Sequence, residues 1–216
     1  MFEFLHQWRF SVLLLALIAN ILFAPLFGAI WALTAFTVLL IIIALVLCKN
    51  RIILTSYVLL AVITLVLTYL HIINTGQASI TSASHFFSFI VLLLAIALII
   101  ANIFSYNIVT ADTIAESLCA YLLLGFAFAH IYALIDIISP NSFMSSLSNE
   151  FVTFEAGLDG IYFSFITLLT VGYGDIVPVS HTAKLTTIIE GFLGQIYLVV
   201  LIARLVGMHV SQNNSE

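Results

Sequence analysis

The sequence predicts an all-α membrane protein, and two observations lead to this fold class. Of the 216 residues, 63% are hydrophobic and only 7% are charged, whereas an ordinary soluble domain carries roughly 25% charged residues. Six apolar runs are also long enough for the roughly 20 residues that a helix needs to span a bilayer. Helices satisfy their backbone polar groups internally, as the hydrocarbon core requires. We therefore expect six transmembrane helices per chain.

The first four runs follow one another with short connections. Residues 10–26 and 29–48 are separated by "APLFG", in which the proline and the glycine indicate a turn. The third run covers residues 52–73. The polar segment "NTGQASITSAS" follows it, and we expect the fourth helix over residues 85–108.

The last two runs enclose a longer connection. The fifth helix is expected over residues 114–138, and Thr113 with Glu116 three positions later resembles a capping box that opens it. The sixth helix is expected over residues 181–209. The connection between these two helices is therefore the longest in the chain.

The few basic residues predict the orientation, because short cytoplasmic loops are enriched in lysine and arginine. Four basic residues fall on the side that holds both chain ends, and only Lys184 falls opposite. The four are Arg9, Lys49, Arg51 and Arg204. We expect a multi-pass protein of the cell membrane with both termini cytoplasmic, and its short extramembrane parts suggest a prokaryotic membrane.

The connection between the fifth and sixth helices therefore faces outward, and acidic residues collect there. They are Asp136, Glu150, Glu155, Asp159 and Asp175. A negative outer surface would concentrate cations near it.

The same connection contains a segment that enters the membrane without crossing it. "GLDGIYFSFITLL", residues 157–169, is apolar but too short to span, which indicates a re-entrant helix. "TVGYGD", Thr170 to Asp175, follows it directly. Gly172 and Gly174 accept backbone conformations that other residues resist, so successive carbonyl groups can turn the same way. Non-helical backbone at membrane depth must be buried in protein or line a water-filled cavity.

"TVGYGD" resembles the selectivity filter of the potassium channel family, and the order of helices around it, over residues 114–209, is similar too. The resemblance implies a potassium-selective channel that conducts K⁺ passively. The K⁺ ligands would be the carbonyl oxygens of Thr170, Val171, Gly172 and Tyr173, with the Thr170 hydroxyl. One chain supplies one oxygen per level, so we expect a homotetramer in the lipid bilayer.

Further residues would support this filter. In the family's arrangement Gly174 and Asp175 close it, and Tyr173 would wedge against Tyr162 and Phe163 of the re-entrant helix. The alternative is that these aromatic residues are ordinary interfacial side chains. The family often has a glutamate four positions before the filter threonine, but Ile166 stands here. A carboxyl pair with Asp175 is therefore not possible.

The sixth helix would line the inner cavity. Aligned with the family, its hinge glycine falls at Gly194, with Gly191 one turn earlier and Gln195 near the cavity wall; close helix packing is an equal alternative for the glycines. Glu190 and Arg204 lie roughly 21 Å apart along the helix and cannot pair. We expect Glu190 to bond to the re-entrant helix backbone or to a neighbour. We expect Arg204 to reach the cytoplasmic interface.

The first four helices resemble a voltage-sensing domain only in number. Residues 85–108 contain neither lysine nor arginine, whereas a voltage sensor carries repeated arginines. We divide the chain into a non-sensing four-helix peripheral domain, residues 1–110, and a pore domain, residues 111–216. The residues after the sixth helix are too few for a soluble ligand-binding domain, so we expect none.

Other classes of function find little support in the sequence. No nucleophile and base occur in a catalytic pattern, and no phosphate loop or basic patch for nucleic acid is present, so we expect neither an enzyme nor a nucleic-acid partner. Two alternatives to a potassium channel remain. One is a non-selective cation channel, and the other is a non-conducting membrane scaffold or regulatory subunit.

Overall fold

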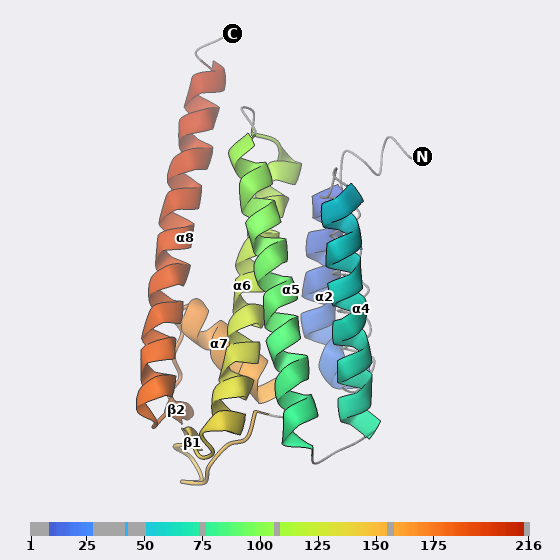
Figure 1. Cartoon of the computed structure of the whole chain (residues 1–216). Coiled ribbons are helices and arrows are strands. Elements are labelled where there is room, and N and C mark those ends of the chain that lie inside the picture. Colours follow the sequence, from blue (N-terminus) through green and yellow to red (C-terminus); the bar gives the residue numbers. More distant parts are fainter. Residues whose placement is uncertain are drawn as a thin grey trace.

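The computed structural model describes residues 9–27, 42, 51–73, 77–105, 109–154 and 158–213. Within this part of the chain the fold is mostly helical (Figure 1). The elements are α2 (Arg9–Phe27), α4 (Arg51–Ile73), α5 (Ala78–Ser105), α6 (Ala111–Ile138), β1 (Phe143–Ser145), α7 (Leu158–Leu168), β2 (Ile176–Pro178) and α8 (His181–Asn213). The expected helix over residues 29–48 lies outside the described residues, apart from residue 42.

Four of these helices are long and apolar enough to cross a membrane: α4, α5, α6 and α8 up to Met208. Shorter apolar helical stretches cover Phe10–Phe23 and Leu158–Leu168. The protein is therefore a multi-pass membrane protein, as its composition predicted.

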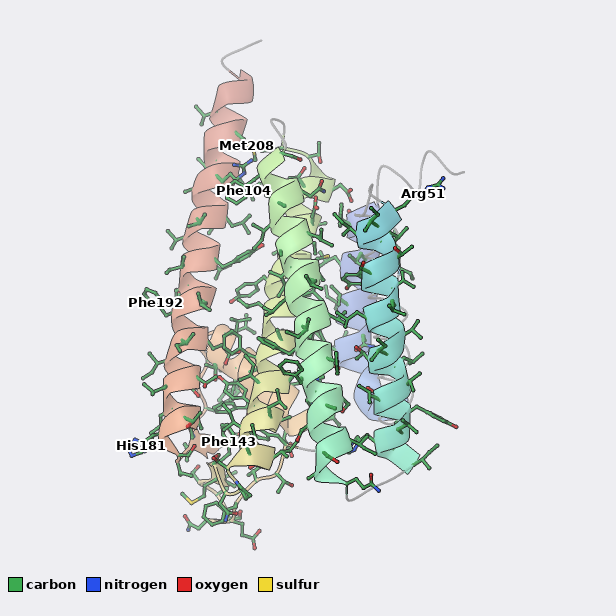
Figure 2. The ribbon with its side chains drawn as sticks, viewed as in Figure 1. Arg51, Phe104, Phe143, His181, Phe192 and Met208 are labelled. Carbon is green, nitrogen blue, oxygen red and sulfur yellow. The ribbon has the colours of Figure 1, made fainter. Side chains whose placement is uncertain are left out.

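The helices pack side by side around α6. In Figure 1, α5 lies against α6, α2 and α4 lie to one side of them, and α8 lies to the other. The short helix α7 runs obliquely between α6 and α8 and contacts both. Figure 2 places Arg51 and Met208 near one end of the bundle and His181 at the other. The segment that follows α7 therefore begins next to α6 and α8.

Helix α5 begins at Ala78, earlier than the expected start at residue 85. The serines and threonines that indicated a loop instead bond to the helix backbone. The Ser82 hydroxyl donates to the Ala78 carbonyl over 2.8 Å, and the Ser84 hydroxyl donates to the Thr81 carbonyl over 2.8 Å. These local bonds satisfy the hydroxyl groups inside a helix, so a polar composition did not mark a loop here.

Helix α6 is capped by Thr110, so the predicted capping box at Thr113 is wrong. The Thr110 side chain accepts from the Thr113 backbone N–H over 3.2 Å. Glu116 is completely buried and accepts from the Asn102 amide over 2.6 Å, across the interface with α5. The carboxylate expected to cap the helix therefore joins two helices.

Asp112, in the first turn of α6, binds the backbone of a different helix. Its Oδ1 atom accepts from the backbone N–H groups of Phe10 and Ser11, over 2.9 and 3.0 Å. Both N–H groups belong to the first described turn of α2. The carboxylate therefore joins α2 to α6.

The expectation of an all-α chain missed one small sheet. β1 and β2 pair antiparallel, with Phe143 opposite Pro178 and Ser145 opposite Ile176. The sheet joins the connection after α6 to the segment before α8, which are distant from each other in sequence. Strands of three residues carry little periodic signal, and only this long-range pairing defines them.

Candidate functional site

The segment after α7 turns back onto the end of that helix. The Ile166 carbonyl accepts from the backbone N–H groups of Val171 and Gly172, over 2.9 and 3.1 Å. The Thr170 N–H donates to the Thr167 carbonyl over 3.0 Å. The last turn of α7 therefore positions the first half of "TVGYGD".

The backbone of this segment alternates in conformation. Thr170, Gly172 and Gly174 have φ angles of 58°, 53° and 75°, in the left-handed region, whereas Val171 and Tyr173 do not have positive φ. Glycine adopts this conformation at little cost. For Thr170 it costs about 1–2 kcal/mol, so the surrounding contacts must hold this residue in place.

The far end of the segment from α7 is fixed by Asp175 and by the connection after α6. The Tyr162 hydroxyl donates to Asp175 Oδ2 over 2.6 Å. The Ser146 N–H donates to the Asp175 carbonyl over 2.8 Å, and the Ser146 hydroxyl donates to the Gly174 carbonyl over 2.5 Å. The Tyr162 hydrogen bond holds the pKa of Asp175 below its usual value, and the same bond raises the pKa of Tyr162 to about 12.

Phe163 lies apart from this network, which corrects one expectation. Its ring packs against Tyr132, Phe143 and Phe154, with centroid distances of 5.0, 5.4 and 5.9 Å. Phe163 is only 3% exposed, whereas Tyr173 is 73% exposed. Within one chain, Phe163 therefore belongs to an aromatic core behind α7 instead of forming a wedge with Tyr173.

Of the acidic residues expected at the outer surface, one is buried and another is exposed. Asp136 is buried, and its Oδ2 atom accepts from the Phe154 backbone N–H over 3.2 Å. Glu150 is exposed, and Glu155 lies outside the described residues. Asp136 therefore stabilises the loop before α7 and adds no charge to the surface.

Glu190 is completely buried on α8 and does not face a cavity. Tyr132 of α6 donates a hydrogen bond to Oε2 of Glu190, and Ser164 of α7 is hydrogen-bonded to Oε1. Of the two partners expected for Glu190, the backbone of the re-entrant helix or a neighbour, the contacts are with neighbouring side chains. Three helices meet at this carboxyl group.

Gly191 and Gly194 of α8 differ in their surroundings. A Cβ atom at Gly194 would lie 2.7 Å from Leu168 Cδ1 and 3.5 Å from the Leu168 carbonyl oxygen. At Gly191 a Cβ would meet nothing within 4 Å in the chain. Gly194 therefore packs against the end of α7, while the neighbouring Gln195 is exposed.

Arg204 contacts the end of α5. Its Nη2 atom donates to the Ile103 carbonyl over 2.9 Å, and its guanidinium lies 4.4 Å from the centroid of the Phe104 ring. Instead of only reaching the interface, this side chain binds a last-turn carbonyl of α5 and stacks on an aromatic face.

Sequence reasoning missed four residues whose hydroxyl groups make the contacts described around α7, α8 and the segment between them. Ser146, Tyr132 and Ser164 have been described. The fourth is Tyr121, whose hydroxyl donates to the Leu168 carbonyl over 2.9 Å. The one available signal was a hydroxyl group inside an apolar run, which needs a partner when it is buried.

Comparison with known proteins supports an ion channel. Residues 116–210 match the ion channel family. The chain is similar to "Two-pore potassium channel 4" of Arabidopsis thaliana, with 34% identity over 44% of this chain and 32% of the relative. It is also similar to "Two pore potassium channel a" of Oryza sativa subsp. japonica, with 31% identity over 34% of this chain and 21% of the relative. The chain thus spans a third or less of these relatives, and no solved structure matches it.

The fold and the family match together define a multi-pass membrane protein with an ion channel domain, which points to transport and not to catalysis. The two relatives carry the name of potassium channels, so the comparisons support, for part of the chain, the resemblance to the potassium channel family that "TVGYGD" predicted.

Proposed function

We propose that this protein is a potassium-selective channel in which Thr170, Val171, Gly172 and Tyr173 bind K⁺ through their carbonyl oxygens, with the Thr170 hydroxyl. The observation that carries the proposal is the alternating backbone, left-handed at Thr170, Gly172 and Gly174. Such alternation lets consecutive carbonyl groups face the same side, so they can replace the hydration shell of an ion.

The surroundings of this segment fit a filter. Residues 169–174 are exposed in the single chain, although α7 before them is apolar and short. Exposed non-helical backbone at membrane depth is stable only where it lines a water-filled space. In this proposal α7 is the pore helix, and the negative end of its dipole stabilises a cation next to the filter.

A homotetramer would complete the site, because one chain supplies one oxygen at each level. Helix α8 supports this assembly. In its most apolar stretch only 11% of the residues are buried, against 67% for α6. Figure 2 shows Phe192 pointing away from the other helices. We infer that this face of α8 contacts neighbouring subunits or lines the cavity, with Gln195 and Gly191 near its wall.

The other helices would form the peripheral domain, residues 1–110, beside the pore domain, residues 111–216. Helix α5 carries no lysine or arginine, so the proposed channel is not gated by an arginine-bearing voltage sensor. Arg51 and Arg204 lie toward the same end of the bundle and Lys184 toward the other. This distribution supports a cytoplasmic location for the end with Arg51, in the cell membrane.

Flux through the purified protein in liposomes tests the proposal. We expect K⁺ flux to exceed Na⁺ flux strongly under equal gradients and to be blocked by barium. Gly172→Ala should abolish it, because an alanine at φ 53° is strained and disturbs the carbonyl alignment. Gly207→Ala is the matched control, since a Cβ there meets nothing within 4 Å in the chain.

The alternatives predict different results. Equal K⁺ and Na⁺ fluxes would indicate a non-selective cation channel. If flux is undetectable, calorimetric titration with K⁺ and then Na⁺ separates a closed channel from a scaffold. A closed channel binds K⁺ selectively and loses this binding in Gly172→Ala, whereas a scaffold binds neither ion selectively.

A further inference from the structure

The buried carboxyl group of Glu190 is the most unusual polar group outside the filter. It is 0% exposed, and its hydrogen-bond partners are Tyr132 of α6 and Ser164 of α7. No lysine or arginine of the described residues lies within ion-pair distance of it. A charge or an incompletely bonded carboxyl group is costly in such a site. Its retention therefore calls for a specific role.

The number of hydroxyl hydrogens in the site indicates how the Glu190 carboxyl group is hydrogen-bonded. Ser164 has a single hydroxyl proton but lies in hydrogen-bonding distance of two oxygens, Glu190 Oε1 and the Gly125 carbonyl at 2.7 Å. All contacts are satisfied when a neutral Glu190 donates to Ser164 Oγ, Ser164 donates to Gly125, and Tyr132 donates to Oε2. The site thus fits a neutral group with one donor and one acceptor.

Ser164 lies two residues before the filter anchor. The carbonyl of Ile166 receives the N–H groups of Val171 and Gly172. Gly194, four residues after Glu190 and so on the same face of α8, packs against Leu168 at the end of α7. The face of α8 with Glu190 and Gly194 therefore holds α7 at two points, both next to the filter.

We propose that Glu190 is a positioning residue that couples α8 to the selectivity filter through Ser164, so that the backbone of residues 170–172 follows the position of α8. This inference rests on the proposed potassium selectivity. It also explains how filter geometry is maintained although Ile166 replaces the carboxylate that the family often has. The bond from Tyr132 serves a different purpose, since it connects Glu190 to α6 and leads away from the filter.

Two variants that each remove one bond to the same carboxyl group test the coupling. Ser164→Ala removes the bond to α7, and we expect the K⁺/Na⁺ permeability ratio to fall about tenfold. Tyr132→Phe removes the bond to α6, and we expect a lower thermal midpoint with the permeability ratio within about twofold of the wild type. A merely structural role for Glu190 would make both variants lose stability and selectivity together.

Substitutions of Glu190 provide a second test that depends on geometry instead of charge. Glu190→Gln places an N–H donor and a carbonyl acceptor at the same reach, although its amide has a second N–H, so it should preserve the permeability ratio. Glu190→Asp keeps the acid but shortens the side chain, so it should lower the ratio as Ser164→Ala does. A selective Asp variant with a non-selective Gln variant would overturn the proposal.

The outcomes separate this inference from the function on which it rests. Wild-type protein without K⁺ selectivity would contradict the proposed function. Selective wild-type protein with equal permeability ratios in Ser164→Ala and Tyr132→Phe would contradict only the coupling. Because both residues are compared in folded protein of measured thermal midpoint, the comparison holds even if a Glu190 variant does not fold.

Discussion

Gly194→Ala should destabilise the protein relative to Gly191→Ala. Both changes replace a glycine by an alanine in α8, so the helix-propensity gain of about 1 kcal/mol cancels between them. What remains is the contact of the new methyl group with Leu168, at 2.7 Å from Cδ1, whereas at Gly191 a Cβ meets nothing within 4 Å in the chain. Leu168 is completely buried and has little room to move.

The size of the difference follows from the cost of overpacking. Inserting a methyl group into a filled site costs about 1–3 kcal/mol. For a chain of this size, 1 kcal/mol shifts the midpoint by about 2–4 °C, so we expect Gly194→Ala to unfold roughly 2–12 °C below Gly191→Ala.

Thermal unfolding of both variants in the same detergent measures this difference, and K⁺ flux is recorded in parallel. If Gly194→Ala unfolds at or above the midpoint of Gly191→Ala, then Leu168 does not confine this position and our packing argument fails. A changed flux at an unchanged midpoint would instead favour the hinge interpretation of Gly194.

Three further predictions concern single contacts. In Tyr162→Phe, Asp175 loses its donor and its lowered pKa returns toward the ordinary value. Because protonation of Asp175 removes a negative charge that attracts cations, K⁺ flux should be constant between pH 5 and 8 in the wild type, and on acidification it should decline at a higher pH in the variant than in the wild type. Arg204→Lys keeps the charge but loses the planar stacking on Phe104, and we expect a loss of about 0.5–2 kcal/mol in thermal unfolding. Asp112→Ala removes two hydrogen bonds to the backbone of α2, with an expected loss of about 0.5–2 kcal/mol in the same assay.

Each of these predictions has a contradicting result. Equal acid midpoints of flux in the wild type and Tyr162→Phe would show that the hydrogen bond does not control Asp175. An unchanged thermal midpoint for Arg204→Lys would show that the charge alone makes the contact with α5 and that stacking on Phe104 adds no stability. For Asp112, the Asn variant keeps an oxygen acceptor, so it should retain more stability than the Ala variant.

The long helices could be predicted because their signal is local and strong. A run of apolar residues with the length of a bilayer span defined α4 almost to the residue, with 52–73 expected and Arg51–Ile73 found. The glycines at positions 172 and 174 likewise indicated left-handed backbone. The start of α5 was missed, because a run rich in serine and threonine is typical of a loop. The same residues also fit a helix when their hydroxyl groups donate to its backbone carbonyls.

The contacts that hold the candidate site could not be predicted, because they join residues distant in sequence. Glu190 is 26 positions from Ser164 and 58 from Tyr132. No pattern along the chain indicates which hydroxyl group a buried carboxyl group will meet. The left-handed conformation of Thr170 was also missed, since a threonine gives no signal for it and only the bonds from Ile166 and Thr167 impose it.

The filter segment is anchored at both ends by its own chain, and this bears on biogenesis. At its inner end Ile166 receives two backbone N–H groups, and at its outer end Ser146 and Tyr162 hold Gly174 and Asp175. In the proposed homotetramer, a newly inserted subunit would carry its quarter of the filter in a defined shape before it meets its neighbours. Assembly would then be the docking of prepared parts, with errors arising at the exposed face of α8.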